Sequence, residues 1–486
     1  MGDLPVLSLL LLMPTAALGL IVILPRTSKL AIKVVSAVSA LLTVLLAAEV
    51  WWLYDVDGPQ YQLQQIVPWL ADFGISYHLG VDGPAVLMTL LNALVFLTGT
   101  LSMWTLQERV KEYFAFMVTL VIGVFGVFVS LDIFFFFFFY ELAVLPMYPL
   151  IAVWGSSNKE YAAMKLTLFL MAGSALLFVG LLALYWSSGL RTFDLVALGQ
   201  HAFDRSFQVA IYPMIYVGFG ILAGMFPLHS WSPTGHVAAP TAVSMLHAGV
   251  LMKLGAFGIF RIAITLLPEG AKAWADTFAI LATVNIVYGA FVALRQTDFK
   301  FVIGFSSVSH MGIVLLGLNV LSADGLNGAV FQMFAHGAMT ALFFSSVGFI
   351  YDQTHCRDIG RFGGLAKQIP IASAFFIIAG LSGMGVPGFA SFWAELLVFV
   401  GAVRGYPLLG VFAIAGLVIS ALFMLRVYLR AFFGPPNPEW NQLKEVSAWG
   451  ALPRAILVCV LLIFGFYPRL ALRLIGPTTS LLLRRF

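Results

Sequence analysis

The chain has few charged residues and almost no cysteine. Only 10% of its 486 residues are Asp, Glu, Lys or Arg, whereas 61% are hydrophobic and the mean hydropathy is +0.98. A soluble globular surface needs more charge than this, so the composition excludes a soluble protein. The two cysteines, Cys356 and Cys459, are too few and too far apart for a metal site, an iron–sulfur cluster or a disulfide framework. We therefore expect no redox centre, metal or other cofactor on this chain.

Two further signals are missing. No glycine-rich phosphate-binding loop follows a strand-like segment, so we expect no nucleotide site. Any energy source would then be a partner protein or an ion gradient. The net charge of +4 is small for this length, and in a membrane protein it reports orientation, so we expect no nucleic-acid binding.

Long apolar runs fill most of the chain. Each is roughly 20 residues long, which is the length that a helix needs to cross a bilayer. The runs are continuous rather than alternating, which argues against barrel strands. The sequence thus predicts an all-α polytopic membrane protein, in one domain over residues 1–486, with polar surface loops at 55–81 and 351–370. About fourteen transmembrane helices are predicted, near residues 6–24, 34–54, 82–104, 112–131, 133–153, 163–188, 209–228, 239–265, 273–294, 301–320, 326–350, 371–400, 406–433 and 450–474.

Lysine and arginine are distributed unevenly between alternate loops. Basic loops of a membrane protein remain on the cytoplasmic side. With the N-terminus outside, the inside loops collect most of the basic residues, including Lys300 and Arg454, whereas Arg261 falls in an outside loop. We therefore expect both termini outside, although the basic tail at Arg484 and Arg485 opposes this orientation.

Two of the predicted helices contain breaks. Pro227 and Pro233 lie at the end of the seventh helix, and Pro387 lies inside the twelfth. Proline lacks a backbone N–H and clashes with the preceding turn, so each helix must kink or stop there. Broken helices at corresponding places in two halves indicate inverted repeats around an ion path. The predicted repeats are helices four to eight (111–265) and nine to thirteen (273–433), flanked by the first three helices (1–110) and a C-terminal helix and tail (450–486).

Three ionisable residues lie deep inside apolar helices. Glu141 and Lys253 fall midway along the fifth and eighth helices, and Glu395 follows the break of the twelfth. A charge at mid-membrane is costly, so such residues usually carry ions or protons. The structural alternatives are an ion pair for Glu141 and a helix cap or a tilt-locking contact for Glu395. Burial and a nearby carboxylate shift the proton affinity of lysine in opposite directions, so a moving partner can load or unload Lys253.

Two histidines lie on neighbouring helices between Lys253 and Glu395. Ser306 precedes His310 by one turn, and His336 lies between Gln332 and Thr340 at the same spacing, so each helix carries a polar stripe. Histidine titrates near neutral pH and can both donate and accept a proton, which suits a relay. A satisfied core histidine is the structural alternative for each.

Four further polar residues give weaker signals. His247 is six residues before Lys253 and therefore lies on another face of the helix. Lys165 lies near the inner end of the sixth helix, where its long side chain can reach water. His229 and His236, beside the broken seventh helix, either line an inlet or cap the helix end.

Together these segments resemble the antiporter-like membrane subunits of respiratory complex I, and the resemblance covers nearly the whole chain. The chain lacks the long C-terminal extension of the terminal antiporter-like subunit. Glu395 matches the glutamate that is typical of subunit M, called chain 4 in mitochondria, where other antiporter-like subunits usually carry lysine. The motifs that carry the resemblance are Gly-Val-Asp-Gly from 80, Tyr-Glu-Leu-Ala-Val-Leu-Pro-Met-Tyr from 140, Pro-Leu-His-Ser-Trp from 227, Ala-Pro-Thr-Ala-Val-Ser from 239, Lys253 and Ser-Ser-Val-Ser-His-Met-Gly from 306.

The resemblance implies a function and a cellular setting. It implies a proton-translocating subunit in the membrane arm of NADH:quinone oxidoreductase, in the bacterial cytoplasmic membrane, surrounded by lipid and other membrane subunits. NADH, FMN, iron–sulfur clusters and quinone would be bound by partner subunits. The implied proton path consists of Glu141, Lys253, His310, His336 and Glu395.

One position departs from the family pattern. The family usually places a lysine five residues before the proline of Pro-Leu-His as the partner of the fifth-helix glutamate, and here that position is Leu222. Lys165 or Lys253 could then pair with Glu141. Three alternatives remain open on the same residues: a multi-subunit cation/proton antiporter, a membrane-bound hydrogenase-type complex, and a structural subunit that does not pump.

Overall fold

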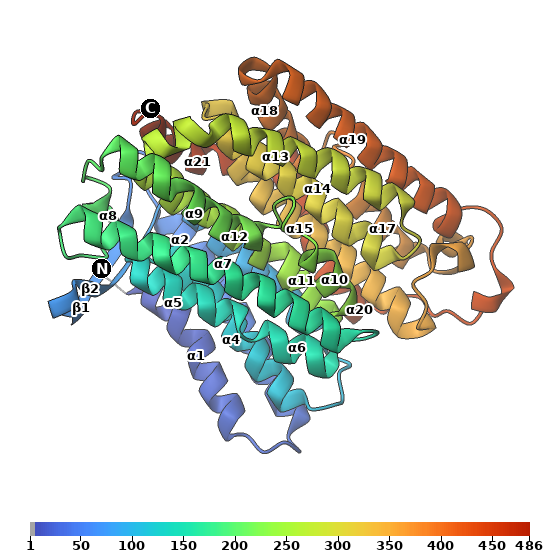
Figure 1. The fold of residues 1–486 in the computed structure, drawn as a ribbon. Coiled ribbons are helices and arrows are strands. Elements are labelled where there is room, and N and C mark those ends of the chain that lie inside the picture. The colour runs from blue at the N-terminus through green and yellow to red at the C-terminus, as the bar shows by residue number, and fades with distance from the viewer. Residues whose placement is uncertain (1–4) are drawn as a thin grey trace.

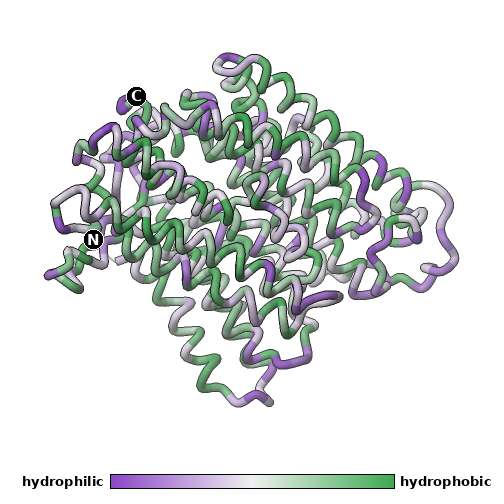
Figure 2. The backbone as a smooth tube through the Cα atoms, viewed as in Figure 1, coloured by the Kyte–Doolittle hydropathy of each residue, from purple (hydrophilic) through white to green (hydrophobic). Residues whose placement is uncertain are grey.

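The computed structural model describes residues 5–486 and is built almost entirely from helices (Figure 1). Within these described residues, thirteen helices are long and apolar enough to cross a membrane, and Pro370–Gly383 is a shorter apolar helix. Hydrophobic residues run along these helices and polar residues collect at their ends (Figure 2). The predicted all-α polytopic membrane fold is therefore confirmed. The helices of the first half are α1 (Val6–Ile23), α2 (Lys29–Leu53), α3 (Gly83–Ser102), α4 (Val110–Val129), α5 (Ile133–Val144), α6 (Met147–Trp154), α7 (Lys159–Ser188), α8 (Leu195–Leu198) and α9 (Arg205–Ala223).

The second half contains the longest buried helices. Three π-helical segments interrupt it, at η2 (His247–Leu251), η3 (Ile259–Ile264) and η5 (Tyr428–Phe432). Its α-helices are α10 (Trp231–Ala238), α11 (Thr241–Leu246), α12 (Met252–Gly258), α13 (Pro268–Arg295), α14 (Phe299–Asn319), α15 (Ala323–Thr354), α16 (Leu365–Gln368), α17 (Pro370–Gly383), α18 (Ala390–Gly405), α19 (Pro407–Val427), α20 (Ala448–Phe466) and α21 (Arg469–Leu483).

Three segments differ from the sequence prediction. The predicted loop 55–81 contains an antiparallel hairpin of β1 (Gln62–Leu70) and β2 (Ile75–Val81). The hairpin turns at Gly74, whose φ of +67° is left-handed and where a Cβ atom would collide with the carbonyl of Arg191. The predicted loop 351–370 contains the end of α15, one 3₁₀ turn at Ile359–Arg361, the short helix α16 and the start of α17. The last predicted helix ends at Phe466, and α21 follows it as a separate helix.

The three prolines occupy different positions relative to the two helix breaks. Pro227 lies in the connection between α9 and α10, and Pro387 lies in the connection between α17 and α18. Pro233 is instead the third residue of α10, where a missing backbone N–H costs no helical hydrogen bond. The seventh helix therefore stops at Ala223 and resumes at Trp231, rather than breaking at both prolines.

The helices fall into an inner and an outer group. The most apolar window of the Thr241–Ile264 unit is 100% buried, and those of α15 and α14 are 94% and 89% buried. By contrast, the windows of α1, α2, α7 and α20 are only 39% buried. Polar side chains on the inner helices are thus surrounded by protein rather than lipid, which is the condition for keeping them at membrane depth.

Candidate functional site

Lys253 lies at the centre of the inner helices. It is fully buried in α12, its Nζ donates a hydrogen bond to the carbonyl of Ala248, and the same Nζ lies 2.8 Å from Nδ1 of His336 on α15. Ala248 belongs to the π-helical turn η2, and such turns are frequent at functional sites. None of the described residues forms an ion pair with Lys253. Its two partners are the neutral carbonyl of Ala248 and the titratable ring of His336.

His336, His310 and Glu395 continue from Lys253. The rings of His336 and His310 are stacked, with centroids 5.3 Å apart and planes 16° apart. His310 Nε2 lies 3.4 Å from Oε1 of Glu395, and Gln332 donates to the same oxygen at 2.9 Å. All four residues are at most 1% exposed. The structure therefore brings Lys253, His336, His310 and Glu395, the last four residues of the path implied by the resemblance, into one row, which we call the central row.

The hydrogen bonds of His310 restrict where its protons can be. Nδ1 lies 2.8 Å from the carbonyl of Ser306, which can only accept, so Nδ1 carries a proton. Nε2 faces the carbonyl of Gly383 at 3.1 Å and the carboxyl of Glu395. The Gly383 carbonyl, like that of Ser306, can only accept, so this contact also favours a proton on Nε2. The ring can therefore donate from Nε2 toward the carboxyl of Glu395 without moving a heavy atom.

The break of the twelfth helix supports this end of the row. Gly383, the last residue of α17, offers its carbonyl to His310 because the chain leaves the helix there. Gly385 has a φ of +68°, and a Cβ atom at this residue would lie 2.9 Å from Oε2 of Glu395. A larger residue would therefore push on the carboxyl as well as strain the backbone.

A second buried cluster lies beside the broken seventh helix. The rings of His236 and His247 are 4.0 Å apart, and both side chains are fully buried. Ser232 lies 3.1 Å from Nε2 of His236, and Trp231 stacks on His247 at 5.2 Å. Both histidines give only weak signals in the sequence, because sequence spacing does not show that the two rings are close in space. The packing of α10 against the Thr241–Ile264 unit is what joins them.

Lys300 is a buried residue that the sequence analysis assigned to a loop. It is 3% exposed and its Nζ donates to the carbonyl of Ala239 at 2.7 Å. It lines a cavity of about 540 Å³ together with Thr241 and Asp352, near the N-terminal end of α14. The hydroxyl of Ser244 lies 3.2 Å from the same Ala239 carbonyl and 3.0 Å from the backbone carbonyl of His236, and it donates its one proton to these two acceptors. The one signal available in the sequence was Asp298, which caps α14 and places Lys300 inside the first helical turn.

The sequence prediction also places Arg261 and Arg454 in loops, whereas both are buried in helical segments of the structure. Arg261 is 2% exposed and makes two hydrogen bonds to Asp82, at 2.8 and 2.6 Å. Arg454 is buried against the carbonyls of Ser345 and Gly450. Both arginines therefore join helices rather than report orientation in the membrane.

Glu141 does not join the central row. Its side chain is half-buried on α5 and accepts a hydrogen bond from the hydroxyl of Ser174 on α7. Across residues 5–486 no ion pair includes this carboxyl, and neither Lys165 nor Lys253, the two candidate partners, contacts it in this structure. Lys165 instead lies 3.5 Å from the hydroxyl of Thr234 and over the ring of Tyr161.

His229 lies in the connection that precedes α10. It is 4% exposed, and its ring packs on Phe226 at 5.7 Å and on Tyr288 at 5.1 Å. Among the described residues, no group of three or more His, Cys, Asp or Glu side chains could hold a metal ion.

Comparison with known proteins gives a consistent result. The family profile described as "NADH:quinone oxidoreductase/Mrp antiporter, TM" matches residues 130–422. The chain is 34% identical to "NADH-quinone oxidoreductase subunit M" of Rhodobacter capsulatus, with 99% of this chain and 96% of the relative covered. It is also 34% identical to "NAD(P)H-quinone oxidoreductase chain 4 1" of Synechococcus sp. (strain JA-3-3Ab), covering 98% and 92% of the two chains.

Two solved structures share the fold. A chain of respiratory complex I from Thermus thermophilus with bound NADH superposes with a TM-score of 0.91 at 26% identity, covering 98% of this chain and 99% of that chain. A chain of the Mrp complex from Dietzia sp. DQ12-45-1b superposes with a TM-score of 0.81 at 20% identity, covering 99% and 96%, which supports the fold alone.

Fold and site together define a polytopic membrane protein with a row of titratable side chains enclosed by its inner helices. The chain belongs to the family of NADH:quinone oxidoreductase/Mrp antiporter membrane subunits. The resemblance to subunit M, or chain 4, that the sequence motifs indicate is confirmed by these relatives.

Proposed function

We propose that this chain is a proton-translocating membrane-arm subunit of NADH:quinone oxidoreductase, of the subunit M type, in a bacterial cytoplasmic membrane with both termini outside. The observation that carries the proposal is the central row, in which Lys253, His336, His310 and Glu395 follow one another through the buried helices. A row of titratable groups at these separations is what proton transfer needs, because each transfer spans a hydrogen bond or one water molecule.

The row suggests how a proton moves. Lys253 as an ammonium donates to Nδ1 of His336, and a proton from that ring reaches His310 by ring rotation or through a water molecule, because the stacked rings do not hydrogen-bond directly. His310 and Glu395 then exchange the proton along the Nε2–Oε1 contact. Loading and emptying of Lys253 would follow charge changes in its surroundings, at about 1.4 kcal/mol for each tenfold change in proton affinity.

The redox chemistry belongs to partners in this proposal. NADH, FMN, iron–sulfur clusters and quinone would be bound by other subunits, and this chain would contribute proton transfer alone. The two inverted repeats expected from the sequence, residues 111–265 and 273–433, are part of the same proposal: the first would carry Lys253 and the second the two histidines and Glu395.

The test is Lys253→Ala in the intact complex reconstituted into vesicles. We expect quinone reduction to continue while the number of protons moved per electron falls, because proton transfer through the row slows by about 10²-fold or more. Lys33→Ala is the matched control, since Lys33 is also buried but donates to the carbonyl of Trp104 away from the row. An unchanged proton-to-electron ratio in Lys253→Ala would support the structural, non-pumping alternative.

A cation/proton antiporter is the second candidate, because the Dietzia Mrp chain shares the fold. Sodium-dependent transport that persists without quinone would favour it over the complex I assignment.

A further inference from the structure

The amide of Gln332 lies against the carboxyl at the end of the central row. Gln332 is fully buried on α15, one helical turn before His336. Its Nε2 donates a hydrogen bond to Oε1 of Glu395 at 2.9 Å, and Nε2 of His310 lies 3.4 Å from the same oxygen. This oxygen therefore has one amide neighbour and one titratable neighbour, and only the histidine can give up a proton to it.

Two polar atoms at this contact have no hydrogen-bond partner among the described residues. They are Oε1 of Gln332 and Oε2 of Glu395, and both are buried. Oε2 faces Gly385, where a Cβ atom would come within 2.9 Å of it. Buried polar atoms are almost always paired, so an unused acceptor beside a titratable carboxyl is unusual. The amide uses its donor alone, which suits a carboxylate but leaves a carboxylic acid without an acceptor.

Close packing of α15 and α18 holds the amide at this distance. Gly328 lies one turn before Gln332, and a Cβ atom at Gly328 would come within 2.8 Å of the carbonyl of Ala394. The backbones of the two helices therefore meet beside the Gln332–Glu395 contact. The last side-chain torsion of glutamine is soft and roughly two-fold, so a turn of the amide plane exchanges its donor for its acceptor without moving either helix.

We propose that Gln332 is a positioning residue for proton transfer from His310 to Glu395, and that its amide turns when the carboxyl is loaded. While Glu395 is ionised, Nε2 of Gln332 donates to it and holds Oε1 toward the ring. In the transfer, the N–H bond at Nε2 of His310 breaks and an O–H bond forms at Oε1 of Glu395, so the charged ring and the carboxylate both become neutral. The new hydroxyl needs an acceptor, and Oε1 of Gln332 supplies it after the turn. The inference rests on the proposed function, because the central row must deliver the proton.

A neutral amide suits a carboxyl that is both loaded and emptied. A lysine or arginine at position 332 would favour the ionised form of Glu395 alone, because an opposite charge nearby stabilises the charged form. An apolar side chain would leave the carboxylate with one donor fewer. Glutamine can donate to the carboxylate and accept from the carboxylic acid, so each state of Glu395 has a partner.

Infrared difference spectroscopy between low and high pH on the reconstituted intact complex tests the contact. The carbonyl band of protonated Glu395 is the band that Glu395→Gln removes. Gln332→Met takes away the amide at similar volume, so we expect this band to move to higher frequency, because the acid loses its acceptor. Gln208→Met is the matched control, since Gln208 is also buried but donates to the carbonyl of Phe203, away from the row. A Glu395 band that stays in place in Gln332→Met would overturn the proposal.

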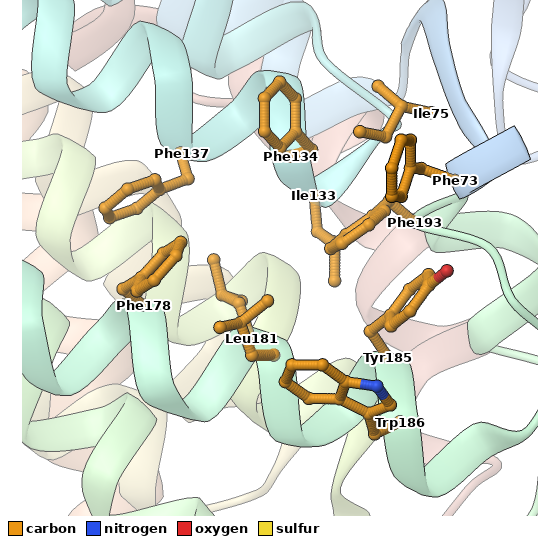
Figure 3. A pocket seen from close by; sticks show the side chains of 11 residues that line it. Phe73, Ile75, Ile133, Phe134, Phe137, Phe178, Leu181, Tyr185, Trp186 and Phe193 are labelled. Carbon is orange, nitrogen blue, oxygen red and sulfur yellow. The ribbon is translucent and has the colours of Figure 1, made fainter. Parts of the chain in front are cut away.

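Glu141 provides an internal reference in the same spectra. It follows Phe137 by four residues on α5, one turn from an apolar pocket of about 210 Å³ that Phe137 and Phe178 help to line (Figure 3). Its hydrogen-bond donor is Ser174 rather than Gln332. A band that Glu141→Gln removes should therefore keep its frequency in Gln332→Met. If the bands of both carboxyls moved together, the change would belong to the whole bundle and the proposal would be rejected.

Proton translocation gives the second readout. We expect Gln332→Met to slow it by about 10- to 100-fold at this step, which corresponds to the loss of one hydrogen bond to a charged group. Because Gln332 acts through Glu395, the double variant Gln332→Met, Glu395→Gln should be little slower than Glu395→Gln alone, and additive losses would count against the proposal. Gln332→Asn keeps a buried amide but withdraws it by one methylene group, so it should change the band and the rate in the same direction as Gln332→Met.

The role of Gln332 and the proposed function fail separately. The band shift is measured without turnover, whereas the proposed function depends on the proton-to-electron ratio of Lys253→Ala. A lowered ratio in Lys253→Ala together with an unmoved Glu395 band in Gln332→Met rejects the role of Gln332 alone. An unchanged ratio together with a shifted band rejects pumping and keeps the contact between Gln332 and Glu395.

Discussion

At the scale of single residues, two buried lysines mark the two ends of one polar segment. Lys300 donates to the carbonyl of Ala239, and Lys253 contacts His336. The rings of His236 and His247 lie in the segment between them, and the hydroxyl of Ser244 contacts the backbone carbonyls of both His236 and Ala239. We propose that an inlet runs through this segment, from the cavity at Lys300, past the two histidines, to Lys253.

Lys300→Met should slow proton delivery to the central row. The variant keeps the apolar stem and removes the amine that faces the cavity, so we expect slower proton translocation, by about 10²-fold at this step. Proton uptake by the reconstituted complex is the measurement. Lys29→Met is the control, because Lys29 is exposed at the start of α2. Uptake by Lys300→Met at the unaltered rate would exclude Lys300 from the inlet.

The sequence identifies residues of the central row but misses Lys300. Lys253, His310 and Glu395 stand far from the ends of long apolar runs, where a titratable group is costly and therefore informative. Lys300 lies at the beginning of a helix, where a lysine normally reaches water, so only the packing of neighbouring helices reveals its burial. The absence of a counter-ion for Glu141 likewise depends on where Lys165 and Lys253 point, which sequence spacing cannot give.

At the scale of elements, a buried ion pair joins two helical units that are far apart in the sequence. Arg261 of η3 forms two hydrogen bonds with Asp82, and Asp82 also caps α3 by accepting from the backbone N–H of Ala85 at 3.0 Å. Neither side chain is more than 2% exposed. The pair therefore fixes the start of α3 against the unit that carries Lys253.

Removing one partner of this pair should be strongly destabilising. We expect Arg261→Met to lower the free energy of unfolding by about 3–5 kcal/mol, because it leaves the Asp82 carboxylate buried without a counter-charge. The double variant Arg261→Met, Asp82→Leu should recover part of that loss. Thermal unfolding in detergent measures both. Arg404→Met, which breaks an exposed pair with Asp324, should change stability by about 1 kcal/mol or less. Equal effects of the buried and exposed pairs would contradict this account.

Asp132 gives the turn between α4 and α5 a pH dependence. It caps α5 by accepting from the backbone N–H groups of Phe134 and Phe135, and it accepts from Ser76 of β2 at 2.9 Å. Burial raises the pKa of Asp132 to about 6, against the lowering effect of these hydrogen bonds and with a small further rise from Asp194. The folded state thus holds the proton more tightly than the unfolded chain does.

The resulting stability has a definite sign. A carboxyl with a raised pKa contributes stability that is complete below its unfolded pKa of 3.8 and is lost as the pH rises through about 6. We expect the free energy of unfolding to fall between pH 5 and pH 7, by at most about 1.4 kcal/mol per pH unit from this group, and the melting temperature in detergent to fall with it. Asp132→Asn should remove that slope. A slope that persists in the variant would assign it to another group.

The sequence predicts the helices better than the segments between them. A run of roughly 20 apolar residues has few structural outcomes in a membrane, which is why the predicted spans appear as helices. The β1–β2 hairpin was missed because Ile66, Val67 and Trp69 of β1 are all exposed, so β1 lacks a regular alternation of buried and exposed residues. The π-helical turns were missed because they depend on how the Thr241–Ile264 unit packs, and no residue pattern marks them.

At the scale of the whole molecule, the titratable groups are ordered by depth within the bundle. The central row lies on the inner helices α12, α14 and α15 and reaches α18, whereas Glu141 lies on the outer surface of α5. The molecule therefore has an enclosed row of titratable side chains and a separate half-buried carboxyl on an outer helix. A change in charge near Glu141 must pass through packed helices to reach Lys253, since no described side chain bridges the two directly.

The orientation of the whole molecule can be tested by labelling. Arg26, Lys29, Arg109 and Lys111 gather at one end of the bundle, so we expect that end to face the cytoplasm and the hairpin end to face outward. In a background with Cys356→Ser and Cys459→Ser, a membrane-impermeant maleimide applied to intact cells should label Asp57→Cys, next to the hairpin. Gln442→Cys, in the exposed α19–α20 connection, should be labelled only after the membrane is opened. The reverse pattern would place both termini inside, and the cavity at Lys300 would then open to the outer side and could not serve as a cytoplasmic inlet.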